Sequence, residues 1–477
     1  MSAIGPDTVA LMPMILLALG GLLILLWDGL RQDSPALSWI ALLVLLGAAF
    51  LEANRLQEGR TLFGGLLRVG GYAAYASGIF LLGGALTVLL SRSYLPKIGH
   101  AHGEVYALLL FALVGMMVMA SANDLVLTFL GLETMSIALY VLTGLAREDA
   151  KANEAAMKYF LLGAFATGFL LYGIALLYGT TGTTRLDLIP ARIPNTPLFW
   201  VGVGLLLVGL LFKIAAAPFH LWTPDAYQGA PTPISGFMAA ASKAAAMSVL
   251  LLVLGHGLGV VSAQWSNLVA AVAALTLVVG NGAALVQEEL KRLLAYSSIA
   301  HVGYALVGLA AANAAGYAGV LFYLLAYAGA AGGAFGVVAL WERQLGRQLP
   351  LRELAGMGYR HPFLSGLLAV FLLSLVGLPP TAGFMAKYAV FAAAVQAQKT
   401  WLALVGVITS MISAYYYLRV LVLLWRPEEA QSAPGFGRLA PAALALAAAL
   451  VLLLGLWPSG VLELVQGFFE DTGLVLR

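Results

Sequence analysis

The stretch that decides the fold is FKIAAAPFHLWTPDAYQGAPTPISGFMAAASK, residues 212–243. A long apolar run carries Lys213 deep inside it, and the chain then re-enters apolar sequence that carries Lys243. Proline removes a backbone donor and clashes with the preceding helical turn, so the apolar run is broken between the two lysines. The prolines concerned are Pro218, Pro224, Pro231 and Pro233. Two ammonium groups and a broken helix are costly in an apolar surrounding, which points to a function that retains them.

The composition of the chain identifies that surrounding as lipid. The 477 residues are 61% hydrophobic and 10% charged, whereas soluble domains contain about 25% charged residues. The apolar runs are about 20 residues long and lack two-residue alternation, which predicts membrane-spanning helices and excludes a barrel. We therefore expect no strands. The net charge of +3 is too small to suggest nucleic acid as a partner, and with no cysteine the chain has no disulfide, thiolate metal site or iron–sulfur ligation.

About fourteen apolar segments follow one another, so we predict an all-α polytopic membrane protein with about 14 transmembrane helices. The seventh span, residues 198–218, breaks at Pro218, and the twelfth, residues 362–395, breaks at Pro379 and Pro380. Two broken spans five apart predict two five-helix repeats, spans 4–8 and 9–13. The expected units are residues 1–103, 104–255, 256–426 and a last span with a short tail, 427–477.

Lysine and arginine in the short loops predict the orientation of the chain. With the N-terminus placed outside, the inside loops hold about twice as many of these residues as the outside loops and tails. Both termini are therefore expected on the outer, periplasmic side. The lysines at 213, 243 and 387 belong to neither set, because all three fall within spans.

Glu133 lies about nine residues into the fifth span, which places it about 13 Å deep in a hydrocarbon core of about 30 Å. It is the one carboxylate that we place at mid-membrane. Lys213, one turn before the Pro218 break, is its natural partner, and a movable Glu–Lys separation would let the pair take up or lose a proton. A carboxyl group held neutral or pinned to a polar neighbour, and a static buried ion pair, are the alternatives.

Two further lysines continue the series. Lys243 lies about ten residues into the eighth span, among small residues, and Lys387 lies seven residues after Pro380. Snorkelling to an interface is the alternative for each, and the mid-span positions argue against it. Three charged lysines with one glutamate would leave a net +2 in a low dielectric, so at least one lysine is expected to rest neutral and the row to pass protons.

A second tier of polar residues accompanies the lysines. We expect these residues to form a secondary proton relay, made up of His220, Ser298, His301 and Tyr304. For the two histidines, a purely structural role is the alternative. The tyrosines 415–417 are expected to form an interfacial belt, and Asp124 to cap a helix. No phosphate-binding loop is present, so ATP is not expected to drive the protein.

Taken together, these residues resemble the antiporter-like proton-translocating subunits of bacterial NADH-quinone oxidoreductase, respiratory complex I, and among them the subunit N family. The stretches that carry the resemblance are LGLETMSIALYVLTG, KYFLLGAFATGFLLYGIALLYG, residues 212–243 quoted above, KRLLAYSSIAHVGYALVG, LPPTAGFMAKY and ITSMISAYYYLRV. They cover roughly residues 104–426, and they are specific in combination rather than singly.

The resemblance implies that the two repeats are inverted and that protons cross by half-channels joined through a central polar axis. Glu133, Lys213, Lys243 and Lys387 occupy the family's axis positions. It implies no cofactor and no metal in this chain, since NADH, FMN, iron–sulfur clusters and quinone belong to partner subunits, whose electron transfer supplies the energy. The implied setting is the bacterial inner membrane, with lipid, other antiporter-like subunits and the remaining membrane-arm subunits as partners.

Three alternatives remain open. One is a subunit of a multi-subunit cation/proton antiporter or membrane-bound hydrogenase, built on the same module. The second is a structural membrane scaffold in which the buried charges are relics, and the third is a stand-alone transporter. Loss of pumping on substitution of Lys213 or Glu133 separates a channel from a scaffold, and co-purification with iron–sulfur and flavin subunits argues against a stand-alone transporter.

Overall fold

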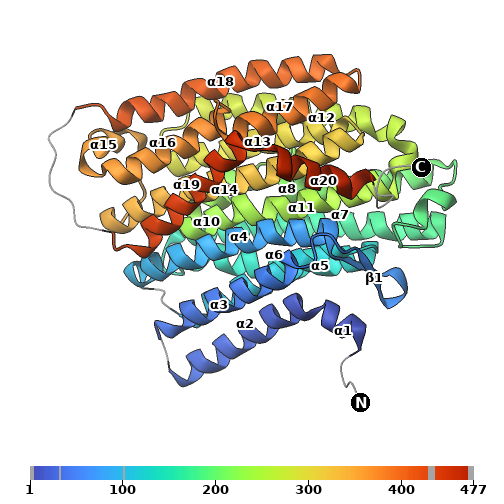
Figure 1. Ribbon diagram of the computed structural model, residues 1–477, viewed down its shortest axis with the longest axis horizontal. Helices are drawn as coiled ribbons and strands as arrows, with labels where there is room; N and C mark the ends of the chain where they lie inside the picture. Colours follow the sequence, from blue (N-terminus) through green and yellow to red (C-terminus); the bar gives the residue numbers. More distant parts are fainter. Residues whose placement is uncertain (1–4, 32–33, 100–101, 428–435, 471–477) are drawn as a thin grey trace.

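The computed structural model describes residues 5–31, 34–99, 102–427 and 436–470. In these residues thirteen helices are long and apolar enough to cross a membrane, and Pro362–Val376 is a shorter apolar helix. The protein is therefore an all-α polytopic membrane protein, as the composition predicts. Figure 1 shows the helices side by side in one bundle, with the first and last spans at its surface.

The elements follow the predicted order of spans. The helices up to the first break are α1 (Pro6–Ala10), α2 (Met12–Leu30), α3 (Ala36–Ala53), α4 (Gly71–Tyr94), α5 (Gly103–Ser121), α6 (Leu125–Thr143), α7 (Ala150–Thr181) and α8 (Pro197–Ile214). The next are α9 (Trp222–Gly229), α10 (Thr232–Phe237), the π-helical turn η4 (Met238–Ser242), α11 (Lys243–Leu250), the π-helical turn η5 (Leu251–Gly257), α12 (Ser262–Leu285), α13 (Leu290–Ala310) and α14 (Ala314–Leu345).

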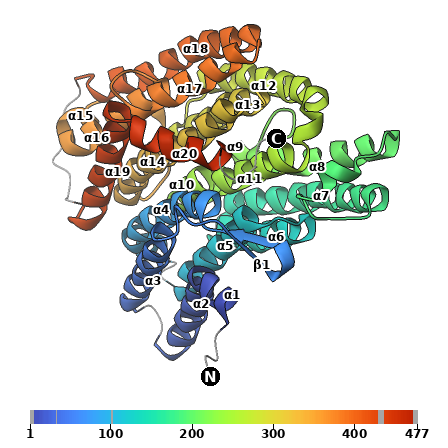
Figure 2. The same ribbon diagram turned by 45° about the vertical axis from the view of Figure 1, so that its right-hand side comes forward.

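The last group of helices contains the second break and the tail. It consists of α15 (Met357–Arg360), α16 (Pro362–Val376), α17 (Ala382–Gln396), α18 (Thr400–Leu424), α19 (Leu439–Leu456) and α20 (Ser459–Glu470). Short 3-10 turns lie between helices, namely η1 (Phe63–Gly65), η2 (Leu95–Ile98), η3 (Ile189–Arg192), η6 (Gly259–Val261) and η7 (Leu351–Leu354). The tail thus carries a short helix, α20, which packs across α14 and α4 and runs in front of the bundle in Figures 1 and 2.

Burial separates a central group of helices from a peripheral one. In the most apolar 18-residue stretch of the span Thr232–Gly257, 100% of the residues are buried. The corresponding share is 94% for α13 and for α14. In α2, α3 and α18 the share of buried residues is only 33%. Figure 1 places α2 and α3 at one edge of the bundle and α18 at the opposite edge. The span that carries Lys243 is therefore at the centre, while the edge helices present leucine side chains to lipid.

Both predicted breaks are present. The helix α8 ends at Ile214, followed by Ala215 at φ 62° and a cis Ala217–Pro218 bond. Between α16 and α17 the chain passes through Gly377 at φ 90° and a cis Pro379–Pro380 bond.

The backbone groups freed at the first break find partners from side chains. The Ala217 N–H donates to the hydroxyl of Thr276 at 3.0 Å, and the indole N–H of Trp222 donates to the carbonyl of Phe212, also at 3.0 Å. Buried partners of this kind are what permits a helix to be broken at membrane depth.

One prediction is wrong: the described chain contains two strands. β1 (Arg60–Leu62) and β2 (Leu67–Val69) form an antiparallel hairpin, and Leu67 also pairs with Ala122 in the turn between α5 and α6. The hairpin belongs to a polar connection between spans, where no long apolar run constrains the backbone to a helix. In the same turn Asp124 caps α6, as predicted, by accepting hydrogen bonds from the backbone N–H groups of the next turn.

Asp225 on α9 joins two spans at one face of the bundle. Its carboxylate lies 2.8 Å from Nζ of Lys158 on α7 and 2.8 Å from Nη1 of Arg292 on α13. Partial burial alone would raise the pKa of Asp225, but the hydrogen bonds and charges of these two cations outweigh it and lower the pKa. The short helix after the first break is thus held by ion pairs to both sides.

Candidate functional site

Lys213 lies at the end of α8, one residue before the helix stops, and is 3% exposed. Its ammonium group donates to Oγ of Ser136 at 2.7 Å and to Oη of Tyr140 at 3.0 Å, both on α6. Nζ also lies 5.1 Å from the centre of the Tyr140 ring. Two hydroxyl groups and an aromatic face therefore form the immediate surroundings of the first lysine.

Glu133 lies on α6 one turn before Ser136, and no ion pair within 4.0 Å joins it to Lys213 in the described structure. The carboxylate is near enough to act electrostatically on Lys213 and on Tyr140. Its Oε1 is buried and accepts no hydrogen bond. The predicted pair is thus separated in this structure, with hydroxyl groups on the lysine side.

Sequence reasoning missed Ser136 and Tyr140. A signal for them exists, because positions 133, 136 and 140 are spaced i, i+3 and i+7 and share one face of a helix. A polar side chain on the same helix face as the half-buried Glu133 is a natural partner for the lysine that pairs with this glutamate.

Lys243 stands where the π-helical turn η4 gives way to α11, and it is 3% exposed. Its Nζ donates to Oγ of Ser298 on α13 at 2.5 Å and lies 5.4 Å from the centre of the Tyr227 ring. The structure therefore brings together two of the predicted residues, Lys243 and Ser298. A single π-helical turn is a frequent feature of functional sites.

His301 lies one turn further along α13 and bridges two tyrosines. Its Nδ1 is 2.7 Å from Oη of Tyr323, and its Nε2 is 3.2 Å from Oη of Tyr417. The Tyr417 hydroxyl also hydrogen-bonds Oγ of Ser297, the neighbour of Ser298 in sequence. Ser297, Tyr417, His301 and Tyr323 thus form a hydrogen-bonded cluster that begins at the sequence neighbour of Ser298.

The expected interfacial belt at positions 415–417 is wrong for two of its three members. Tyr416 and Tyr417 are both 0% exposed, and only Tyr415 faces outward at 62%. Consecutive helical residues point about 100° apart, so a tyrosine triplet cannot all face one way. The inward pair belongs to the polar interior instead of the membrane surface.

Lys387 on α17 closes the row at the second break. Its Nζ donates to the carbonyl of Val376, the last residue of α16, at 2.7 Å and to Oγ of Ser410 at 2.8 Å. It lies 4.4 Å from the centre of the Tyr304 ring. A cation at a helix C-terminus is stabilised by the exposed carbonyls, so the broken helix itself supplies part of the lysine's environment.

Tyr304 extends this end of the site. Its hydroxyl accepts from Nδ2 of Asn281 on α12 at 3.5 Å, and Oδ1 of Asn281 accepts from Tyr416 at 3.1 Å. The predicted residue Tyr304 is thus next to Lys387, and Asn281 and Tyr416 are additional members that the sequence did not identify.

His220 is the predicted residue that stands apart. It lies half-buried in the turn between α8 and α9, beside the exposed Pro218. The hydrogen bonds of the three lysines go to other residues. Its Nδ1 is buried without a hydrogen-bond partner. In the described residues no group of three or more His, Asp or Glu side chains could hold a metal ion.

Residues 122–413 match the protein family described as NADH:quinone oxidoreductase/Mrp antiporter, transmembrane. The chain is 49% identical over 471 residues to an NADH-quinone oxidoreductase subunit N of Salinibacter ruber, covering 95% of this chain and 94% of that protein. A chain of respiratory complex I from Thermus thermophilus superimposes with a TM-score of 0.83 at 39% identity, and the match covers 94% of this chain and 98% of that chain. A chain of an archaeal membrane-bound sulfane sulfur reductase shares the fold, with a TM-score of 0.87 at 24% identity. The match covers 98% of this chain and 100% of that chain.

Proposed function

Because this chain belongs to the NADH:quinone oxidoreductase/Mrp antiporter family, and within it to the subunit N proteins of NADH-quinone oxidoreductase, we propose that it conducts protons across the membrane along its row of buried lysines. The chain is a multi-pass membrane subunit of that complex, and its partners are the other membrane-arm subunits. The setting is a bacterial membrane, as for the relatives it matches.

One observation carries the proposal. Lys213, Lys243 and Lys387 are 3–5% exposed, and in the described structure no carboxylate lies within 4.0 Å of their ammonium groups. A buried ammonium without a counter-ion is strongly disfavoured, so its proton is readily given up. Each lysine nevertheless contacts a hydroxyl group that can donate or accept in turn.

The hydroxyl groups supply a route between the lysines. From Lys243 the proposed route passes to Ser298, crosses to its sequence neighbour Ser297, and continues through hydrogen bonds to Tyr417 and His301. A charge on Lys243 and a charge on Lys387 both act on His301, which lies between them. Protonating one site disfavours protonation of the next, and this mutual bias is what moves a proton along the row.

Glu133 is assigned the role of the movable counter-ion. When it approaches Lys213 it favours the charged ammonium, and when it withdraws, as in the present geometry, the lysine releases its proton toward the next site. The free energy comes from NADH-to-quinone electron transfer in partner subunits, which hold the NADH, FMN, iron–sulfur and quinone chemistry, with no redox centre in this chain. The broken helices at Pro218 and at Pro379–Pro380 provide free carbonyls and room for water beside the first and last lysines.

The arrangement in the membrane follows from the same proposal. Residues 104–255 and 256–426 are assigned to two inverted repeats, each with one broken helix, and both termini are assigned to the outer side. A fluorescent protein that matures only in the cytoplasm, fused to the C-terminus, should stay dark. A bright fusion in an assembled, active complex would overturn the orientation.

The function is tested in the assembled complex reconstituted into vesicles, by following proton pumping and NADH oxidation together. Lys213→Ala and Glu133→Ala should each abolish pumping through this subunit while the complex still assembles. Lys399→Ala is the matched control, since this lysine bonds Ser266 and Asn267 away from the row and should pump normally. Unchanged pumping in both test variants would support a structural scaffold instead.

The rival reading is a cation/proton antiporter or hydrogenase subunit built on the same module. The fold alone does not identify complex I, since a different respiratory membrane complex, the archaeal sulfane sulfur reductase, shares it at 24% identity. Purification through a tag on this chain should recover flavin and iron–sulfur subunits that oxidise NADH. Recovery of an antiporter assembly or of a hydrogenase in their place would favour the rival, and recovery of the chain alone would favour a stand-alone transporter.

A further inference from the structure

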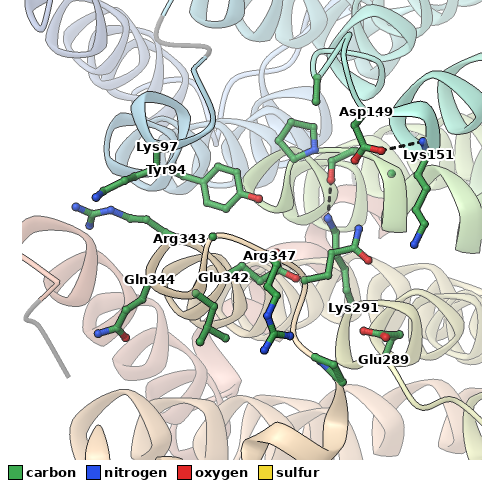
Figure 3. A pocket seen from close by; sticks show the side chains of 18 residues that line it. Tyr94, Lys97, Asp149, Lys151, Glu289, Lys291, Glu342, Arg343, Gln344 and Arg347 are labelled. Atoms are coloured by element: carbon green, nitrogen blue, oxygen red, sulfur yellow. Dashed lines mark hydrogen bonds between the residues drawn. The ribbon is translucent and has the colours of Figure 1, made fainter. Parts of the chain in front are cut away.

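A cavity of about 800 Å³ opens at one end of the bundle, lined by residues of α4, α7, α9, α13 and α14 and of the loops beside them. Most of its charged lining is basic, and it lies at the face that the lysine and arginine distribution assigns to the cytoplasm. Figure 3 shows the labelled side chains around it, namely Tyr94, Lys97, Asp149, Lys151, Glu289, Lys291, Glu342, Arg343, Gln344 and Arg347. The row of lysines described above does not include any of them.

Glu342 is the unusual member of this lining. It lies near the end of α14 and is only 4% exposed, although it borders the cavity. Its Oε2 accepts a hydrogen bond from the hydroxyl of Thr232. Its Oε1 is buried and has no hydrogen-bond partner. A buried carboxylate oxygen without a donor is costly, and a proton on the carboxyl group removes much of that cost.

Three ionisable groups from neighbouring elements face Glu342. Lys291 on α13 is 3% exposed and acts electrostatically on it, with Nζ donating to the carbonyl of Ala230 at 2.5 Å. Tyr94 on α4 and Glu289, which precedes α13, interact with it as well. Lys291 and Glu289 thus present side chains of opposite charge to the same carboxyl group.

Thr232 connects the carboxyl group to the centre of the protein. It begins the fully buried span that also carries Lys243, eleven residues later, which corresponds to about 16 Å along a helix. Between them lies Ser235, bonded to the carbonyl of Tyr227 at 2.6 Å, and the Tyr227 ring borders Lys243. Glu342 is therefore a residue of the cavity lining that is hydrogen-bonded to the span of Lys243.

We propose that Glu342, with Thr232, is the proton-loading site of this subunit, which takes a proton from the basic cavity and passes it toward Lys243. The inference rests on the proposed proton conduction and adds the residue at which conduction begins. The basic rim keeps other cations out of the cavity, whereas a proton arrives through water and needs only one acceptor oxygen. The unpartnered Oε1 is that acceptor.

The test uses the assembled complex in vesicles. Glu342→Gln keeps the size and a bond to Thr232 but cannot carry the proton, and it should reproduce most of the loss of pumping caused by Lys243→Ala. Glu342→Asp should retain part of the pumping. Glu288→Gln is the matched control, because Glu288 is an exposed carboxylate close in sequence to the cavity and outside its lining, and it should pump like the wild type.

Infrared difference spectroscopy supplies a second readout that does not depend on turnover. On acidification the wild type and Glu288→Gln should show a protonated-carboxyl C=O band that is missing from Glu342→Gln. Normal pumping in Glu342→Gln, with pumping abolished in Lys243→Ala, would overturn the inference and leave proton conduction intact. Lost pumping with an unchanged carboxyl band would also overturn it, by showing a structural role.

A further variant keeps the proposal testable if Glu342→Gln fails to assemble into the complex. Thr232→Val preserves the buried carboxyl group and removes only the hydroxyl that links it to the span of Lys243, so pumping should fall. If Glu342→Gln is not recovered in the complex, the proposal is rejected by wild-type pumping in both Thr232→Val and Glu342→Asp together with a protonated-carboxyl band that neither variant shifts.

Discussion

Replacing Tyr417 by phenylalanine removes one oxygen atom from the middle of the polar route and leaves the ring in place. In the present structure that oxygen serves both Oγ of Ser297 and Nε2 of His301. No other hydrogen bond of the described structure serves either atom, so both would be orphaned in a fully buried setting. The variant should therefore lose stability and proton conduction together.

The size of the stability loss follows from these two contacts. An orphaned buried polar group costs about 1–3 kcal/mol, so two of them cost about 2–6 kcal/mol. Side-chain hydrogen bonds between membrane helices average only about 0.6 kcal/mol in coupling, which favours the lower part of that range. Removing both partners of a hydrogen bond at once is nearly neutral, so Ser297→Ala combined with Tyr417→Phe should recover the part of the stability lost at Ser297. The part lost at Nε2 of His301 should remain, and pumping should not recover.

The measurements are thermal release of this subunit from the solubilised complex and proton pumping per NADH oxidised. Tyr415→Phe is the matched control, because Tyr415 is on the same helix and 62% exposed, and it should leave both quantities unchanged. If Tyr417→Phe pumps at the wild-type rate, the route through Ser297 and His301 is wrong. If the double variant regains pumping along with stability, the hydroxyl groups are structural.

Gly377 has φ 90° at the second break, and a Cβ there would lie 2.9 Å from Cδ of Lys387. Gly377→Ala should therefore cost about 1–2 kcal/mol from backbone strain alone and lower pumping by displacing the lysine. Gly366→Ala, inside α16 where a Cβ meets nothing within 4 Å, should not destabilise the protein and should leave pumping unchanged; equal behaviour of the two variants would refute this. The pKa of Asp225 is lowered because its two flanking cations outweigh the effect of burial. The stability that the ion pairs add is therefore present above the unfolded pKa of about 3.9, and it disappears as pH falls through the lower folded pKa. Thermal melts of the wild type and Asp225→Asn should accordingly differ at neutral pH and converge in acid, with the exposed Glu148→Gln as a control that shows no such gap; a gap that persists in acid would contradict the assignment.

Composition and spacing alone predicted the helical membrane fold, the two broken spans and the cap at Asp124. Lipid leaves the backbone few choices, so a 20-residue apolar run is a helix and a proline within it is a break. The hairpin at residues 60–69 was missed because this restriction ends outside the apolar runs.

The tertiary structure alone decided which side chains meet. The helices of this chain are apolar on nearly every side, so periodicity does not reveal which face turns inward, and Tyr416 and Tyr417 read as a surface belt although both are buried. Thr232 and Glu342 are 110 residues apart and are brought together only by the packing of α10 against α14. In a membrane protein the sequence fixes the depth of a charge through its position in a span, whereas helix rotation and packing decide its partners.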